Sequence, residues 1–161
     1  MVYMDKLLKN TDYLEQLDRL EQLEQERQFC RHGLPHLLDT ARLIWIRCLE
    51  GRRTMDKEMI YLTALLHDLG RIDQYETGTP HPEAGAERAG VLLSAIGYPP
   101  ERIGKIQEAI LGHRGSNSTG DVVELSALLC WADQRSRMCF CCRQREVCNW
   151  REDQKNETIT D

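Results

Sequence analysis

Aromatic residues and long apolar runs are both scarce in this sequence. Phe, Trp and Tyr make up 6% of the 161 residues, and Leu, Ile and Ala supply most of the apolar side chains. This balance favours helices over a β-sandwich, because leucine-rich sets at helical spacing build bundles. No stretch approaches the roughly 18 apolar residues that a membrane-spanning helix needs. The first residues also lack the apolar core and cleavage site of a secretory signal.

A basic tail or stripe is also missing, and the formal net charge is −5. A nucleic-acid polymer is therefore not an expected partner, nor is a membrane. A small phosphorylated molecule remains compatible, because a few local Arg side chains suffice for one phosphate group. The seven cysteines are an odd number and accompany no secretion signal. We therefore expect a cytoplasmic, reduced protein whose cysteines serve packing or metal binding.

The length and the 41% of hydrophobic residues suit one all-α domain with one core. We expect an N-terminal helix packed on the core over 1–28, a helical bundle over 29–137 and a short cysteine-rich appendage over 138–161. The first helix carries leucines at a spacing of three between residues 12 and 27. Such a stripe packs on its own domain or forms a homodimer, although it is too short for a sustained coiled coil.

Apolar residues at i, i+3, i+4 and i+7 predict the helices of the bundle. Asp56 is the predicted N-cap of one helix, and Gly51 and Gly97 are predicted helix stops. Loops are expected near 75–80 and 115–120, where Gly, Pro, Ser, Thr and Asn gather. The predicted helices cover about 34–49, 57–70, 82–96, 100–110 and 121–137.

Ionisable residues interrupt several of these apolar stretches. His67 is followed directly by Asp68, and the pair ends an apolar helix. An imidazole and a carboxylate in that position are costly to bury unless they are paired or bind a metal. Asp133 lies in another apolar stretch and needs a cation or a donor network for the same reason. Such ligands suit Mn²⁺, Fe²⁺ or Zn²⁺ better than a thiolate site would.

The order of these residues matches a known signature. His36, then His67-Asp68, then Asp133 resembles the H…HD…D pattern of the HD superfamily of metal-dependent phosphohydrolases, and Leu66–Arg71 resembles its LLHDIGK/R segment. The resemblance implies a helical bundle in which these four residues bind one metal ion. It also places His67 and Asp68 at the catalytic centre, where Asp68 could guide the proton of an attacking water.

The resemblance covers about residues 29–137 and extends to two more histidines. His81 and His113 match the extra histidines of two-metal members, so the family likeness implies one or two divalent ions such as Fe or Mn. Thr40 stands where the family's HxxxVA element has Val. Among two-metal members, the spacing resembles the bacterial HD hydrolases that cleave dinucleoside tetraphosphates symmetrically.

Three further residues are candidates for contact with substrate phosphate. The resemblance puts a phosphate-binding basic residue at Arg71, and Arg114 follows His113 directly. For each of these arginines the alternative is a solvated surface charge. His32 lies four residues before His36, with a Gly and a Pro between them. Four placements of His32 remain open. It could lie beside the metal ligands, face the substrate, do neither, or be the first metal ligand instead of His36.

The appendage places four cysteines within ten residues. Cys139 and Cys142 form a C-x-x-C pair, and Cys148 could be a third ligand. Cys30 or Cys141 could complete a tetrahedral zinc or iron–sulfur site. A redox-responsive set of thiols and free, partly buried thiols are the alternatives.

Three functions are compatible with this pattern. The first is hydrolysis of a phosphoester or phosphoanhydride with metal-activated water, and the resemblance implies that the substrate is a nucleotide. The second is an oxygenase, since a few HD-type proteins use a di-iron pair, and dependence on O₂ would distinguish it. The third is a non-catalytic metal or nucleotide sensor with the cysteine tail as its readout.

Overall fold

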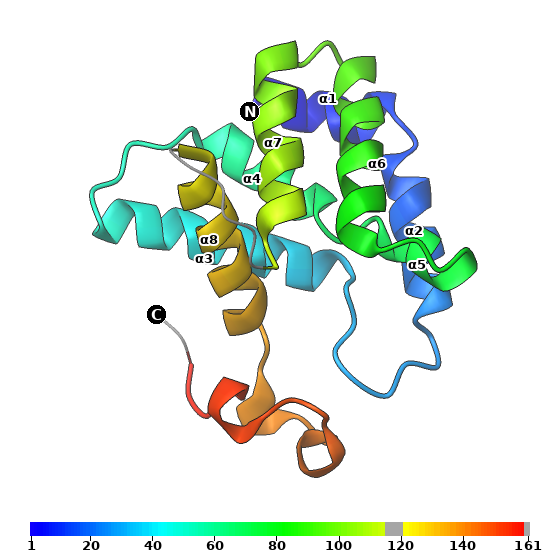
Figure 1. Ribbon diagram of the computed structural model, residues 1–161, viewed down its shortest axis with the longest axis vertical. Coiled ribbons are helices and arrows are strands. Elements are labelled where there is room, and N and C mark those ends of the chain that lie inside the picture. Colours follow the sequence, from blue (N-terminus) through cyan, green and yellow to red (C-terminus); the bar gives the residue numbers. More distant parts are fainter. Residues whose placement is uncertain (115–120, 160–161) are drawn as a thin grey trace.

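The computed structural model describes residues 1–114 and 121–159, and the loop expected at 115–120 lies outside them. Within these ranges the chain forms helices, turns and loops and no strand, which confirms the all-α prediction (Figure 1). None of the helices described is long and apolar enough to cross a membrane. The α-helices are α1 (Val2–Asn10), α2 (Tyr13–Leu23), α3 (Leu34–Glu50), α4 (Lys57–Leu66), α5 (Arg71–Glu76), α6 (His81–Ala95), α7 (Pro100–Gly112) and α8 (Asp121–Arg135).

The N-terminal part holds two helices where the sequence predicted one. Thr11 separates them, because its hydroxyl donates to the Leu7 carbonyl at 2.6 Å and accepts from the Tyr13 amide at 3.2 Å. Tyr13 is fully buried and donates to the Leu65 carbonyl of α4 at 3.2 Å, so α2 is anchored on the bundle. Leu14, by contrast, is 45% exposed, and the leucine stripe is only partly turned inward.

The bundle agrees closely with the periodicity of the sequence. Ile103, Ile106 and Ile110 of α7 are buried, as the spacing predicts. Asp56 caps α4 by accepting from the Met59 amide at 3.0 Å. The short helix α5 was not predicted; it begins just after the predicted helix end near residue 70 and runs into the start of the loop expected near 75–80.

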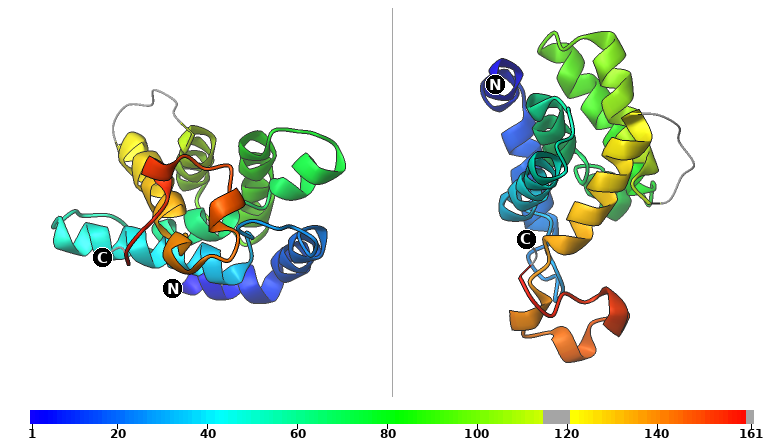
Figure 2. Two further views of the ribbon diagram at one scale, coloured as in Figure 1. Left: turned by 90° about the horizontal axis from the view of Figure 1, so that it is seen from below. Right: turned by 90° about the vertical axis from the view of Figure 1, so that its left-hand side faces the viewer.

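Helix ends from distant parts of the chain meet on one side of the bundle (Figure 2). His36 is the third residue of α3 and His81 the first residue of α6, while His67 and His113 cap the C-termini of α4 and α7. Asp133 lies in the last turn of α8. C-terminal helix ends carry partial negative charge, which favours a cation there.

Gly70 sets the distance between two of these helix ends. A Cβ atom on Gly70 would lie 2.1 Å from the His81 carbonyl oxygen and 2.2 Å from the Gly85 amide nitrogen. Both contacts are with backbone, so no side-chain rotation relieves them. The absence of a side chain at Gly70 therefore lets the turn that follows His67 pack directly on the first turn of α6.

We expect Gly70→Ala to lower the free energy of unfolding by about 3 kcal/mol, because the added methyl group forces backbone apart. Gly104→Ala is the matched control, since its Cβ would meet nothing within 4 Å in the helix α7. That control should stabilise the protein by up to about 1 kcal/mol through helix propensity. Urea unfolding measures both, and equal stabilities of the two variants would contradict this account of Gly70.

Candidate metal centre

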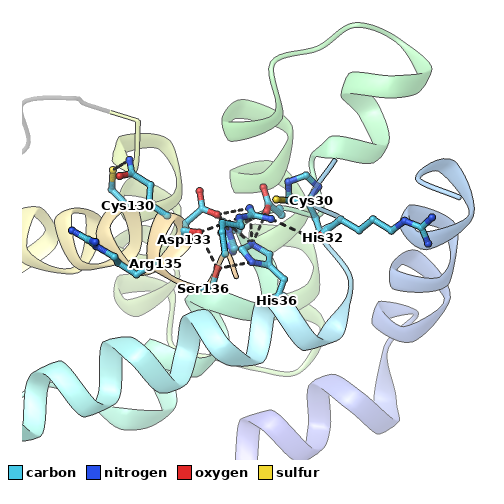
Figure 3. A network of polar contacts seen from close by, with 12 residues as sticks. Cys30, His32, His36, Cys130, Asp133, Arg135 and Ser136 are labelled. Carbon is cyan, nitrogen blue, oxygen red and sulfur yellow. Dashed lines mark hydrogen bonds and ion pairs between the residues drawn. The ribbon is translucent and has the colours of Figure 1, made fainter. Parts of the chain in front are cut away.

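Four of the predicted ligands converge in the structure. The ligand atoms of His36, His67, Asp68 and Asp133 all lie within 4.8 Å of one another, and all four residues are buried. The Nε2 atom of His36 is 3.3 Å from an oxygen of each aspartate, and the Nε2 atom of His67 is 3.1 Å from Asp68 Oδ2. Figure 3 shows His36 and Asp133 turned toward each other from α3 and α8. The arrangement can hold one divalent ion.

All five histidines form one continuous row. In the order His32, His36, His67, His113 and His81, successive ring centroids are 5.6, 5.6, 5.7 and 5.6 Å apart. The row brings together residues that are up to 81 positions apart in the sequence, from His32 to His113. His113 and His81 therefore extend the four-residue group and offer nitrogen ligands for a second ion.

The histidine rings are oriented by hydrogen bonds through Nδ1. A carbonyl can only accept, so the Nδ1 of His67 and of His113 must carry a proton, and in the neutral ring Nε2 then has a free lone pair. A hydrogen bond that fixes the ring through Nδ1 in this way is typical of metal-binding histidines. The Nδ1 partners are Ser136 Oγ for His36, the Ala64 carbonyl for His67, Gln74 Oε1 for His81 and the Ile110 carbonyl for His113.

Within the described residues, four potential ligand atoms at this site are buried without a hydrogen-bond partner. They are the Nε2 atoms of His67, His81 and His113 and the Oδ2 atom of Asp68. Buried polar atoms are almost always hydrogen-bonded, because leaving one unpaired costs about 1–3 kcal/mol. A bound cation would satisfy such lone pairs, so the donor set fits divalent metal ions.

The charge states around the centre also suit metal binding. Burial alone would raise the pKa of Asp68, but the nearby His67 and Arg71 hold it well below its usual range. Burial lowers the pKa of His81 to about 3 and also lowers that of His113. Near neutral pH, Asp68 is therefore a carboxylate and these two imidazoles are neutral, which is the form that binds metals.

Arg137 is a site residue that the sequence analysis missed. Its guanidinium is buried, with Nη2 2.8 Å from Asp133 Oδ1 and 3.2 Å from His36 Nε2. Ser136, which holds His36, was missed as well. Both follow Asp133 at i+3 and i+4, so helical spacing could have placed them on its face.

His32 lies beside the four-residue group and not within it. Its Nδ1 is 2.5 Å from Glu24 Oε1, and its amide donates to the other oxygen of Glu24 at 2.7 Å. Burial opposes ionisation of Glu24, yet its hydrogen bonds with His32 bring its pKa down to about 2. Glu24 stands in a run of acidic and amide residues, and no feature of the sequence distinguished it. The geometry thus favours His36 over His32 as the first ligand.

The two predicted phosphate-binding arginines have different surroundings. Arg71 is buried, and among the described residues only its Nε makes a hydrogen bond, to Asp68 Oδ1 at 2.7 Å. Arg114 is exposed and lies at a cavity of about 400 Å³. The cavity is lined by His113, Arg114, Cys130, Asp133, Gln134, Trp150 and Gln154. The appendage, through Trp150 and Gln154, thus forms part of the wall beside the candidate ligands.

Comparison with known proteins identifies the family of the chain. The family model of the HD domain matches residues 34–138. A Clostridium beijerinckii protein described only as uncharacterized is 39% identical over 153 residues, which are 95% of each chain. A crystal structure from an uncultured Thermotogales bacterium, described as a predicted HD superfamily hydrolase, shares the fold with a TM-score of 0.62. That chain is 22% identical, and the match covers 89% of this chain and 81% of that one.

The fold and the site therefore define the class of protein: it is all-helical and has a buried His/Asp centre. The chain belongs to the HD domain family, as its motifs predict.

We expect metal content to distinguish the histidines of the four-residue group, His36 and His67, from His81 and His113. His81→Ala should bind one ion fewer than the wild type, because the four-residue group remains intact, whereas Asp68→Ala should lose both ions. His32→Ala is the control and should keep the wild-type content, since its Nδ1 is held by Glu24. Manganese can be counted by mass spectrometry after gel filtration. Full metal content in His81→Ala, or its loss in His32→Ala, would contradict the assignment.

Proposed function

We propose that this protein is a metal-dependent phosphohydrolase that uses two ions to cleave a phosphoester or phosphoanhydride in a small substrate, a nucleotide. One observation carries the proposal: four buried nitrogen and oxygen atoms from three parts of the chain make no hydrogen bond with any residue in 1–114 or 121–159. The likeness to a structure described as a predicted HD superfamily hydrolase is consistent with it.

The chain's own residues would prepare the reaction in defined ways. Divalent ions bound at such a site lower the pKa of water to about 7 and stabilise charge on a phosphoryl group. Arg71 fixes the carboxylate of Asp68 through its Nε, at 2.7 Å. A carboxylate held in this way is positioned to accept a proton from an attacking water. Ser136 likewise holds the His36 ring in place, through the hydrogen bond between its Oγ and His36 Nδ1.

The cavity beside the centre supports a phosphorylated substrate with a base. Arg114 brings a positive charge to it although the chain as a whole carries −5. Trp150 of the appendage lines the same cavity. Its side chain is an indole, and indole rings stack on nucleobases. A nucleotide would thus place phosphate near His113 and Arg114 and its base near Trp150.

The direct test is hydrolysis of a nucleotide panel by manganese- or iron-loaded protein. The panel contains mononucleotides, cyclic dinucleotides and dinucleoside tetraphosphates, and products are separated by chromatography. We expect turnover of at least one nucleotide by the wild type and none by Asp68→Ala, whose ligand set is broken. Symmetric cleavage of a dinucleoside tetraphosphate would identify that subclass.

Three results would contradict this function. If metal-loaded protein hydrolyses nothing in the panel, the hydrolase proposal fails for nucleotides. If the protein instead transforms a substrate only when O₂ is present, the site is that of an oxygenase. Equal activity in Asp68→Ala would show that the activity comes from a contaminant.

We expect Trp150→Leu to raise KM for a nucleotide about tenfold, because base stacking on an aromatic ring contributes about 1–3 kcal/mol. The KM for a phosphoester without a base should not change. Phe140→Leu is the matched control, because Phe140 is an exposed aromatic residue of the same appendage that does not line this cavity. Steady-state kinetics measure all three proteins, and an unchanged KM in Trp150→Leu would remove the indole from the substrate site.

A further inference from the structure

Three cysteines of the appendage are brought together by successive backbone turns. Cys139 begins the 3₁₀ turn η1 (Cys139–Cys141), and the amide of Cys142 donates back to the Cys139 carbonyl at 3.1 Å. The next turn, η2 (Arg145–Val147), leads directly into Cys148 and contacts η1. The C-x-x-C pair and the third cysteine therefore lie on one compact fold of the chain.

A fourth cysteine reaches the same place from the other end of the sequence. Cys30 lies in the segment that leads into α3, close to His32 (Figure 3). It lines a cavity of about 340 Å³ together with Cys139, Cys141 and Cys142. Figure 2 likewise shows the appendage beside the segment before α3.

Cys148 also lies near Cys30, because its charge affects the pKa of the Cys30 thiol. Burial is the main cause that raises the pKa of the Cys30 thiol, and Arg137 opposes it. Negative charge on Cys139, Cys142 or Cys148 raises it further, so all three lie within electrostatic reach of Cys30. Cys141 is exposed, and its thiol donates to the Met138 carbonyl at 3.5 Å.

The appendage has almost no apolar core to hold this arrangement. Of its described hydrophobic residues only Cys139 is buried, while Met138, Phe140 and Val147 are 63%, 42% and 65% exposed. Its main anchor is Asn156, which donates to the carbonyls of Gln134 and Arg137. Units too small to bury a core usually need a disulfide or a metal ion, and all seven cysteines are free thiols.

We propose that Cys30, Cys139, Cys142 and Cys148 bind one structural zinc ion, separate from the His/Asp centre. Four thiolates are a ligand set typical of structural zinc, and a closed tetrahedral site stabilises a small fold directly. Within the described part of the chain, only the His/Asp group already has its ligand atoms within 4.8 Å of one another. The four sulfurs would therefore close on the ion and draw the appendage onto the segment before α3.

This zinc ion would fix two edges of the candidate active site. Cys30 lies two residues before His32, and Cys139 two residues after Arg137, whose guanidinium contacts His36 and Asp133. Cys148 lies two residues before Trp150, which lines the cavity beside His113. The positioning role rests on the proposed function, whereas the zinc site itself does not.

The test counts zinc in the full chain with Asp68→Ala as background, so that ions at the His/Asp centre do not contribute. We expect one zinc ion per chain in this background. Adding Cys142→Ser should remove it, whereas adding Cys141→Ser, the neighbouring control, should leave it in place. Cobalt substituted for zinc should give the visible bands of tetrahedral thiolate coordination, and Cys142→Ser should abolish them.

Three outcomes would overturn the zinc site: no zinc in the Asp68→Ala protein, equal loss of zinc in the two serine variants, or iron with labile sulfide in place of zinc. The count on Asp68→Ala needs no cysteine variant, so misfolding of Cys142→Ser cannot hide the answer. In the otherwise wild-type chain, loss of this zinc should raise the nucleotide KM as Trp150→Leu does. An unchanged KM in a zinc-free protein would overturn the positioning role.

Discussion

The burial of unpaired nitrogen and oxygen atoms at one end of the helical bundle is the constraint on which the rest of the structure depends. His67 and Asp68 are both fully buried, although each carries a polar atom without a partner. Such burial is unfavourable unless a cation completes the site. The surrounding contacts, from the Nδ1 hydrogen bonds to the packing of Gly70 against α6, keep these atoms turned toward one another.

The fold could be predicted from the sequence to the extent that apolar spacing determines it. The periodicity identified α3, α4, α6 and α7, and the Asp56 cap was correct. It did not identify α1 or α5, because short helices are stabilised by tertiary contacts more than by their own pattern. Thr11, whose hydroxyl both ends α1 and holds the first amide of α2, gave no clear signal in the sequence.

The candidate site was predictable where the residue type itself is costly to bury. His36, His67, Asp68 and Asp133 stand out in apolar helices, and the structure brings them together. Residues that act through another residue were not predictable, because their role depends on three-dimensional proximity. Glu24 is one acidic residue among many, and Arg137 follows the helix that carries Asp133 without any motif of its own.

The appendage lies beside the candidate active site. It supplies Trp150 to the cavity, and Arg137, which contacts Asp133, directly precedes it. A family match that ends at residue 138 leaves most of this segment outside the HD domain. Features that distinguish this chain from other members of the family are therefore expected in the appendage, whereas the chemistry is expected in the bundle.

The measurement that tests the central claim most directly is the thermal unfolding midpoint of metal-free protein with and without added Mn²⁺. Binding to the folded state alone stabilises it by about 2.7 kcal/mol when the free ion is at 100 times Kd. We expect a clear rise of Tm in the wild type and none in Asp68→Ala. An identical Tm with and without the ion in the wild type would contradict the claim that the buried His and Asp atoms form a metal centre.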